Sequence, residues 1–227
     1  MWQIFLVSII PGLLWLWFFY RQDVYEPEPR RLLFLLFVLG MLGVIPAFLL
    51  ELPWHQMYLN SLQQRDLVKL AVFFFVIIGG TEETIKLLIL HYFLRRQPEF
   101  DEPLDGMIYG VTVGLGFAAL ENLLYAAAGR GWGIGLYRAL VTSLAHASFT
   151  GWIGYYLSVA KFSRRSYLIP FGLLLAIAMH GSYDFILLSG IGIAGLGSFL
   201  LVGISMALLL YKMRQLESWS PFRPPGS

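Results

Sequence analysis

Long runs of apolar residues constrain this chain more than any other feature of its sequence. A membrane-spanning helix needs roughly 20 predominantly apolar residues, and a window of that length finds seven separate runs. The runs cover residues 2–20, 32–50, 67–94, 104–128, 136–160, 167–188 and 191–211. Short connections that contain proline, glycine or charged residues separate them. The sequence therefore predicts an all-α, polytopic transmembrane bundle of about seven spans.

The composition supports this prediction. The chain is 58% hydrophobic and only 13% charged, which excludes an ordinary soluble domain. Its net charge of +2 gives no reason to expect a nucleic-acid partner. The absence of cysteine rules out disulfides, thiolate catalysis and cysteine-bound metals. The first run lacks the features of a cleaved signal, and we see no internal repeat, so we expect residues 1–227 to form one integral-membrane domain.

The basic residues are distributed unevenly among the connections. Eleven Lys and Arg fall in the first, third and fifth connections and the C-terminal tail, against four on the other face, which include Arg138. The positive-inside rule then predicts an N-terminus outside and a cytoplasmic C-terminus. The pattern does not decide whether residues 51–66 contain an interfacial segment.

Several ionisable side chains lie inside the apolar runs, where an unpaired charge is costly and usually marks a functional site. They come from four consecutive runs and comprise Glu82, Glu83, Lys86, Glu121, His146, His180 and Asp184. Residues four apart share a helix face, so His180 and Asp184 are expected to stack, and Lys86 to lie one turn from both glutamates. A bundle that turns these faces inward would gather them in one cavity suited to metal binding or proton transfer.

The depth of these groups can be estimated from the helical rise. Counted from the outer ends of their runs, Glu121, His146, His180 and Asp184 lie roughly 10, 13, 12 and 6 Å deep. Glu83 comes out at roughly 24 Å by the same arithmetic. It would meet the others only if its helix is strongly tilted, bends at Gly79-Gly80, or begins later than residue 67.

Small residues predict where helices approach closely. Gly110 and Gly114 have the spacing of a close helix contact, and three further glycines suggest similar contacts. These three are Gly116, Gly151 and Gly154.

The ionisable residues form four short motifs in a fixed order. They read Glu82-Glu83-x-x-Lys86, Phe117-x-x-x-Glu121, a single His146, and His180-x-x-x-Asp184. Over roughly residues 70–188 the chain thereby resembles the PrsW family of intramembrane proteases, within the wider group of CAAX prenyl endopeptidases and bacteriocin-processing enzymes. The resemblance implies an endopeptidase of the bacterial cytoplasmic membrane with a catalytic core at about 67–188. Family members cleave a membrane-anchored anti-sigma factor on its extracytoplasmic side, which makes a membrane-anchored protein the expected substrate.

Peptide hydrolysis inside a bilayer needs a confined water, a base and a group that stabilises the oxyanion. Two histidines and carboxylates could hold zinc, which activates bound water and polarises the carbonyl. We expect His146, His180 and Glu121 as zinc ligands. The expected catalytic carboxylates are Glu82, Glu83, Glu121 and Asp184, with Glu83 as general base and Asp184 orienting His180 or acting as an alternative ligand. Lys86 would neutralise Glu82, Phe117 would form a dry wall, and Asn122 would bind substrate backbone or bond between helices.

Other interpretations stay open at this point. A glutamate could activate water without a metal while a histidine stabilises the oxyanion. A proton-coupled or ion-coupled transporter would also bury such groups, although the chain shows no inverted repeat. Glu82, Glu83 and Lys86 taken alone would be compatible with a structural ion pair.

Overall fold

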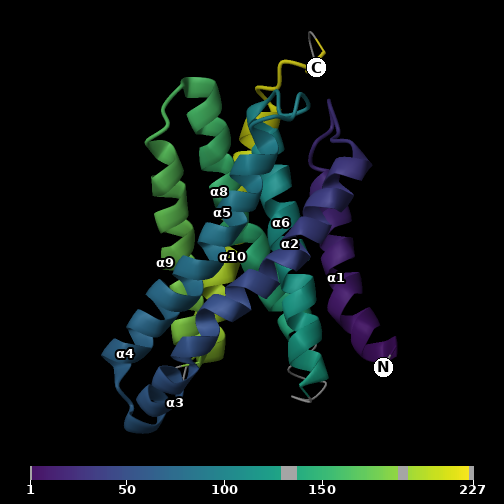
Figure 1. Cartoon of the computed structure of the whole chain (residues 1–227). Helices are drawn as coiled ribbons and strands as arrows, with labels where there is room; N and C mark the ends of the chain where they lie inside the picture. The colour runs from purple at the N-terminus through teal and green to yellow at the C-terminus, as the bar shows by residue number, and fades with distance from the viewer. Residues whose placement is uncertain (1, 129–136, 189–193, 225–227) are drawn as a thin grey trace.

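The computed structural model describes all residues except 1, 129–136, 189–193 and 225–227, and of residues 2–6 and 194 it describes the backbone only. The described residues are predominantly helical, and none of them forms a strand, which confirms the predicted all-α fold (Figure 1). The helices, in chain order, are α1 (Trp2–Tyr20), α2 (Arg30–Glu51), η1 (Leu52–Trp54), α3 (His55–Gln64), α4 (Leu67–Val72), η2 (Phe73–Gly79), α5 (Gly80–Leu94), α6 (Pro103–Ala127), η3 (Arg138–Thr142), α8 (Ser143–Ser163), α9 (Leu168–Leu188) and α10 (Ala194–Glu217).

The helix boundaries follow the predicted apolar runs closely. The run at 67–94 is occupied end to end by α4, η2 and α5, and α2 extends the run at 32–50 by a few residues. The undecided segment 51–66 is helical, because η1 and α3 continue from α2. The first residues of two predicted runs, at 136 and 191–193, lie outside the described residues.

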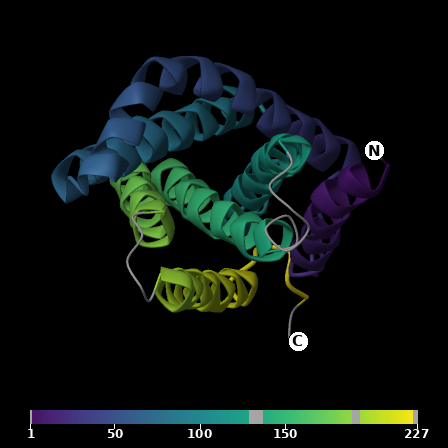
Figure 2. The same cartoon turned by 90° about the horizontal axis from the view of Figure 1, so that it is seen from below.

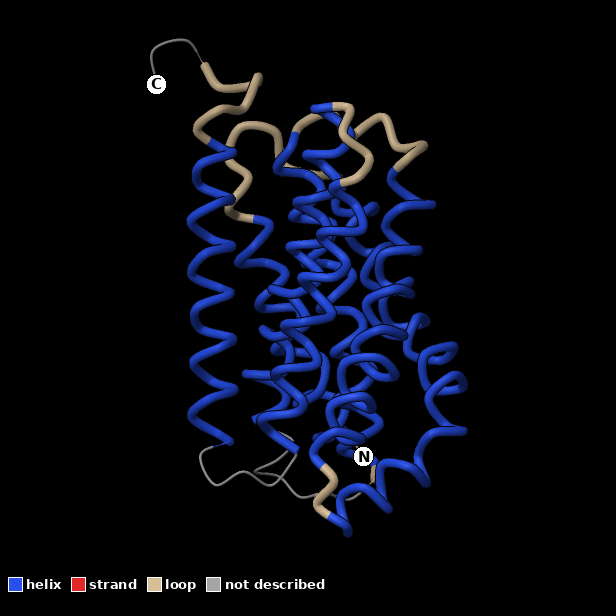
Figure 3. The backbone as a smooth tube through the Cα atoms, turned by 90° about the vertical axis from the view of Figure 1, so that its left-hand side faces the viewer, coloured by secondary structure: helices blue, strands red, loops and turns tan. Residues whose placement is uncertain are grey.

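Successive long helices run in alternating directions, and the described ends of the chain lie at opposite ends of the bundle (Figures 1 and 3). The connections rich in Lys and Arg and the C-terminal segment share one end, which we call the basic end. Among the residues that the structure describes, four helical stretches are long and apolar enough to cross a membrane, namely Arg30–Gln64, Pro103–Ala127, Leu168–Leu188 and Gly195–Glu217. The segment α5 carries Glu82, Glu83 and Lys86 among its 15 residues, so it is less apolar than these four. The count of seven spans and their orientation stay predictions.

The helix α6 is the most enclosed of these four stretches, with 78% of its apolar window buried against 28% for α9 and for α10. Seen from below, α8 lies between α10 on one side and α5 with α2 on the other (Figure 2). Glycines allow α6 and α8 to approach closely, as predicted: a Cβ on Gly154 would lie 1.8 Å from the carbonyl oxygen of Gly106. One on Gly114 would lie 2.4 Å from that of His146. The central pair of helices is therefore packed backbone against backbone.

The segment from Leu67 to Leu94 crosses the bundle obliquely (Figure 1). A π-helical stretch, η2, interrupts it. Phe73 and Phe74 of this stretch pack on Tyr58 of α3, and the rings of Tyr58 and Phe73 are stacked at 5.0 Å. Gly79 and Gly80 keep helical backbone angles, so the bend at these glycines, one of the three alternatives considered from the sequence, is absent. The departure from a regular α-helix occurs just before the motif that carries the glutamates.

A buried glutamate anchors the α1–α2 connection to α6 at the basic end. The hydroxyl of Tyr109 donates a hydrogen bond to Glu28, which is 1% exposed. Burial raises the pKa of Glu28, and the nearby charges of Asp105, Glu26 and Asp23 act in the same direction, so the pKa reaches about 9 although the bond from Tyr109 lowers it. Glu28 is thus expected to be protonated in the folded protein near neutral pH.

Candidate active site

The first turns of α5 bring two glutamates and a lysine together in the interior. The ammonium nitrogen of Lys86 lies 2.8 Å from Glu83 Oε1 and 3.1 Å from Glu82 Oε2. Lys86 and Glu83 are completely buried and Glu82 is 5% exposed. The lysine therefore pairs with both glutamates, as its position one turn away predicted, and not only with Glu82, the partner it was expected to neutralise.

The two histidines lie directly against this group. His180 Nδ1 of α9 is 2.7 Å from Glu83 Oε1, and His146 Nδ1 of α8 is 2.9 Å from Lys86 Nζ. The two imidazole rings meet edge to face, with centroids 5.2 Å apart. Glu83 thus does reach the layer of the histidines, because α4, η2 and α5 follow an oblique course through the bundle (Figure 1). The depth arithmetic failed because it assumed upright helices.

Glu121 of α6 lies on the opposite side of His146. Its Oε2 is 2.9 Å from His146 Nε2, and its Oε1 is 2.7 Å from Arg138 Nη2. The Arg138 contact is an ion pair without an aligned hydrogen bond, since that nitrogen has no hydrogen-bond partner among the described residues. The guanidinium also lies 3.7 Å from the ring centroid of Tyr125.

Arg138 is a site residue that the sequence interpretation missed. It was counted among the basic residues of the outer face, yet it is only 8% exposed in the structure. The signal was available, because Arg138 lies inside the apolar run at 136–160, where a charge needs a partner. Glu121, some 17 residues earlier, supplies that partner.

Asp184 contacts His180 as the spacing predicted. Its Oδ2 is 3.3 Å from His180 Nε2, one helical turn away. The side chain of Asp184 is 16% exposed and that of Glu121 is 18% exposed, whereas Glu83 is fully enclosed. The more accessible side of the cluster is therefore the side of Asp184 and Glu121.

The supporting residues take up positions around this cluster. The ring of Phe117 lies 4.1 Å from Lys86 Nζ and 5.6 Å from the His146 ring, so it covers both, as expected of a wall. The amide of Asn122 donates to Ser143 Oγ at 3.0 Å, which is the interhelical bonding considered from the sequence. Thr150, which the sequence did not single out, donates to Glu83 Oε2 at 3.3 Å.

A further carboxylate, Glu51 at the end of α2, was also missed. Glu51 interacts electrostatically with Glu82, Glu121 and His180. Its Oε1 is buried without a hydrogen-bond partner among the described residues. It lies just after an apolar run, and no pattern in the sequence indicates that it turns toward the site.

The donor atoms of Glu82, Glu83, His146 and His180 all lie within 4.8 Å of one another. Glu82 Oε2 is 3.8 Å from His180 Nε2 and 3.9 Å from His146 Nδ1, which is too far for hydrogen bonds. Ligands that bind zinc tetrahedrally at 2.0–2.2 Å are themselves separated by about 3.5 Å. The second nitrogen of each ring faces a carboxylate, Glu83 or Glu121, as is usual for metal-bound histidines. This arrangement fits a metal ion.

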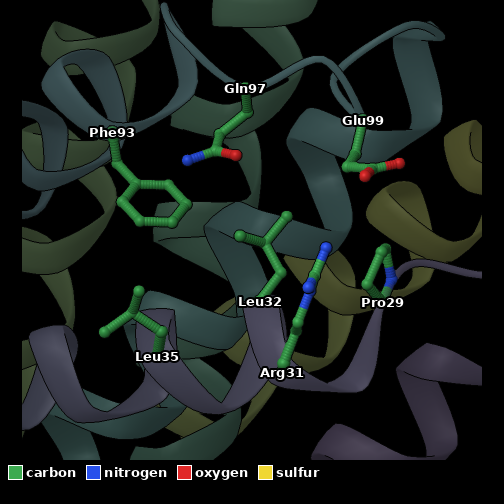
Figure 4. A pocket seen from close by; sticks show the side chains of 7 residues that line it. All are labelled: Pro29, Arg31, Leu32, Leu35, Phe93, Gln97 and Glu99. Carbon is green, nitrogen blue, oxygen red and sulfur yellow. The ribbon is translucent and has the colours of Figure 1, made fainter.

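A separate cavity of about 280 Å³ lies at the basic end, between the start of α2 and the end of α5 (Figure 4). Arg31, Phe93 and Glu99 are among its lining residues, and none of the cluster residues lines it. The chemistry of the site is therefore contained in the packed cluster and not in this cavity.

Fold and site together define a helical membrane protein with a carboxylate and imidazole cluster of hydrolytic type in its interior. A family model described as "PrsW family intramembrane metalloprotease" matches residues 28–211. The chain is 34% identical over 191 residues to Protease PrsW of Geobacillus kaustophilus, covering 83% of this chain and 81% of that protein. It is 35% identical over 192 residues to Protease PrsW of Bacillus subtilis, with coverage of 82% and 84%. No solved structure matches. The chain belongs to the PrsW family of intramembrane proteases.

Proposed function

We propose that this membrane protease hydrolyses a peptide bond in a membrane-anchored protein by means of the cluster on α5, α6, α8 and α9. The observation that carries the proposal is that carboxylates and imidazoles from four helices meet within hydrogen-bonding distance. The resemblance noted in the sequence makes an anti-sigma factor the first substrate to test. Residues 67–188, which hold all of these groups, would form the catalytic core.

The position of the cluster supports cleavage in the outer half of a bacterial cytoplasmic membrane. Glu121 lies near the end of α6 that is remote from the basic end, and His146 lies near the start of α8 at the same level. The positive-inside rule assigns the basic end to the cytoplasm. The cluster would then be accessible from the extracytoplasmic side, where a membrane-anchored substrate would be cleaved.

For the metal, the proposed ligands are His146 and His180 together with a carboxylate. Glu82 fits this third role because its Oε2 faces a nitrogen of each ring. Glu121, the ligand predicted from the sequence, contacts the other side of the His146 ring and is the alternative. A zinc ion held there would polarise the scissile carbonyl and activate a water molecule.

The protein groups around the metal ligands divide into positioning and proton-transfer roles. Glu83 receives contacts from Lys86, His180 and Thr150 and is fully buried, so it would orient His180 and not act as the base first expected. Glu121 is 18% exposed, and its Oε2 lies 2.9 Å from His146 Nε2. It would accept the proton of the attacking water, with Asp184 on the same accessible side.

One observation favours a mechanism without metal. Lys86 Nζ lies among the same donor atoms, 2.8 Å from Glu83 and 2.9 Å from His146 Nδ1. A cation already provided by the protein would let a glutamate activate water directly, with a protonated histidine holding the oxyanion. Zinc content decides between the two mechanisms.

The test uses purified protein in detergent and a single-span substrate. Glu83→Ala, Glu121→Ala and His180→Ala should each abolish cleavage, and unchanged cleavage in all three would refute the proposal. Zinc should be present at about one ion per chain and should be lost in His146→Ala and His180→Ala. His91→Ala is the matched control, because His91 is outside the cluster, and it should keep both zinc and activity. In the metal-free alternative, active protein would contain no zinc.

A further inference from the structure

Three carboxylates from distant parts of the chain meet at the basic end. Asp23 follows α1, Glu102 immediately precedes α6, and Glu217 is the last residue of α10. One oxygen from each lies within 4.8 Å of the others. Asp23 is 3% exposed and Glu102 is 1% exposed. The three segments lie together at the top of the bundle in Figure 1. We call this set the acidic triad.

Hydrogen bonds hold one oxygen of each triad member in place. The backbone amide of Val24 donates to Glu217 Oε1 at 2.8 Å, and that of Glu26 donates to Asp23 Oδ1 at 3.3 Å. The hydroxyl of Ser220 donates to Glu102 Oε2. The carboxylates are therefore fixed by partners that come from two separate chain segments.

The second oxygen of each triad member has no such partner. Asp23 Oδ2, Glu102 Oε1 and Glu217 Oε2 are buried and lack a hydrogen bond among the described residues. Buried polar atoms in proteins nearly always have a partner, so three orphan oxygens in one place require an explanation. The charges that act most strongly on Asp23 are those of Glu217, Glu102 and Glu26, all of the same sign. A bound cation would satisfy the oxygens and neutralise the repulsion.

The donor atoms indicate which kind of cation fits. The triad offers carboxylate oxygens only, which suit hard ions such as Mg²⁺ and Ca²⁺, whereas zinc in proteins is usually bound through nitrogen or sulfur. Glu102 and Glu121 are 19 residues apart along α6 and its N-cap, or about 28 Å by helical rise. The triad is thus separate from the catalytic cluster.

We propose that Asp23, Glu102 and Glu217 bind a hard divalent cation, Mg²⁺ or Ca²⁺, that ties the α1–α2 connection and the end of α10 to the start of α6. The site is structural, and it does not depend on the proposed function of the catalytic cluster.

The test is cation-dependent stability of the full chain in detergent, after EDTA treatment and removal of the chelator. Intrinsic tryptophan fluorescence follows thermal unfolding during separate titrations with Mg²⁺ and Ca²⁺, and the ion with the larger shift identifies the preferred occupant. The unfolding midpoint should rise with at least one ion. Mn²⁺ binding, measured by electron paramagnetic resonance, should weaken by at least about tenfold in Glu217→Gln. Glu99→Gln, an acidic residue of the same end outside the triad, should bind Mn²⁺ like the wild type.

The difference in unfolding temperature between the triad variants and the wild type should also change sign when divalent ions are added. Simple loss of folding would not give this change. Without divalent ions, Asp23→Asn and Glu217→Gln should unfold at or above the wild-type temperature, because a repelling charge is gone. With Mg²⁺ or Ca²⁺, the wild type should gain stability and the variants should not. His180→Ala should keep the wild-type response, since the catalytic cluster is not involved. The absence of any ion response in the wild type, or an equal response in both triad variants, would overturn the proposal.

Discussion

Replacing Arg138 by glutamine tests whether this residue positions the proposed catalytic carboxylate. The change removes an ion pair of 2.7 Å to Glu121 and a guanidinium that lies 3.7 Å from the Tyr125 ring. Both partners of the pair are largely enclosed, with side-chain exposures of 10% and 18%. Removing one partner of a buried pair costs about 3–5 kcal/mol, and the partial exposure of Glu121 favours the lower value. If this cost falls entirely on the orientation of Glu121 in the active enzyme, about 3 kcal/mol corresponds to roughly a 100-fold loss of activity.

The assay is the initial rate of cleavage of a single-span substrate, with size-exclusion chromatography as a check on folding. Arg138→Lys keeps the charge but loses the planar group over Tyr125, so about a tenfold loss is expected. If Arg138 acts through Glu121, the double variant Arg138→Gln/Glu121→Gln should be no slower than Glu121→Gln alone. A wild-type rate in Arg138→Gln, or losses that multiply in the double variant, would show that the reasoning is wrong.

Three further predictions follow from the packing and charges. Gly114→Ala places a Cβ 2.4 Å from the carbonyl oxygen of His146, so thermal unfolding should reveal a loss of about 1–3 kcal/mol, whereas Gly203→Ala, with nothing within 4 Å, should be neutral. Glu83→Gln should weaken zinc binding by about 10–100-fold in a chelator competition, and unchanged affinity would contradict its orienting role. The pKa of Glu28, raised from 4.5 to about 9, means that the folded state binds the extra proton, so stability should fall as pH rises across that window. Melting in EDTA should show a shallower pH dependence in Glu28→Gln, and an unchanged slope would refute this.

Local patterns predicted much of the fold and part of the site. Apolar runs of spanning length located the helices, and the spacing of four residues predicted the contact of His180 with Asp184. The glycines predicted close helix contacts, which the structure places mainly between α6 and α8, with Gly116 against α2. Each of these relations depends on the geometry of one helix or on its surface composition, which the sequence expresses directly.

Relations between helices were harder to predict. The pairing of Arg138 with Glu121 and the bond from Thr150 to Glu83 join residues on different helices, and their spacing carries no periodic signal. The depth of Glu83 depended on the tilt of its helix, which is set by packing against neighbours and not by its own residues. A buried charge without a local partner, such as Arg138, is the signal that could have pointed to a partner on another helix.

The π-helical stretch η2 sets the rotational phase of the residues that follow it. A π-bulge is equivalent to one residue inserted into an α-helix, and one residue corresponds to a rotation of about 100°. The aromatic residues at 73–74 face α3, while Glu83, a few residues further on, faces the histidines. Deleting a single residue from 73–79 would preserve the hydrophobicity of this segment but turn the glutamates away from α8 and α9. The length of this stretch, and not only its composition, is therefore a requirement for assembling the site.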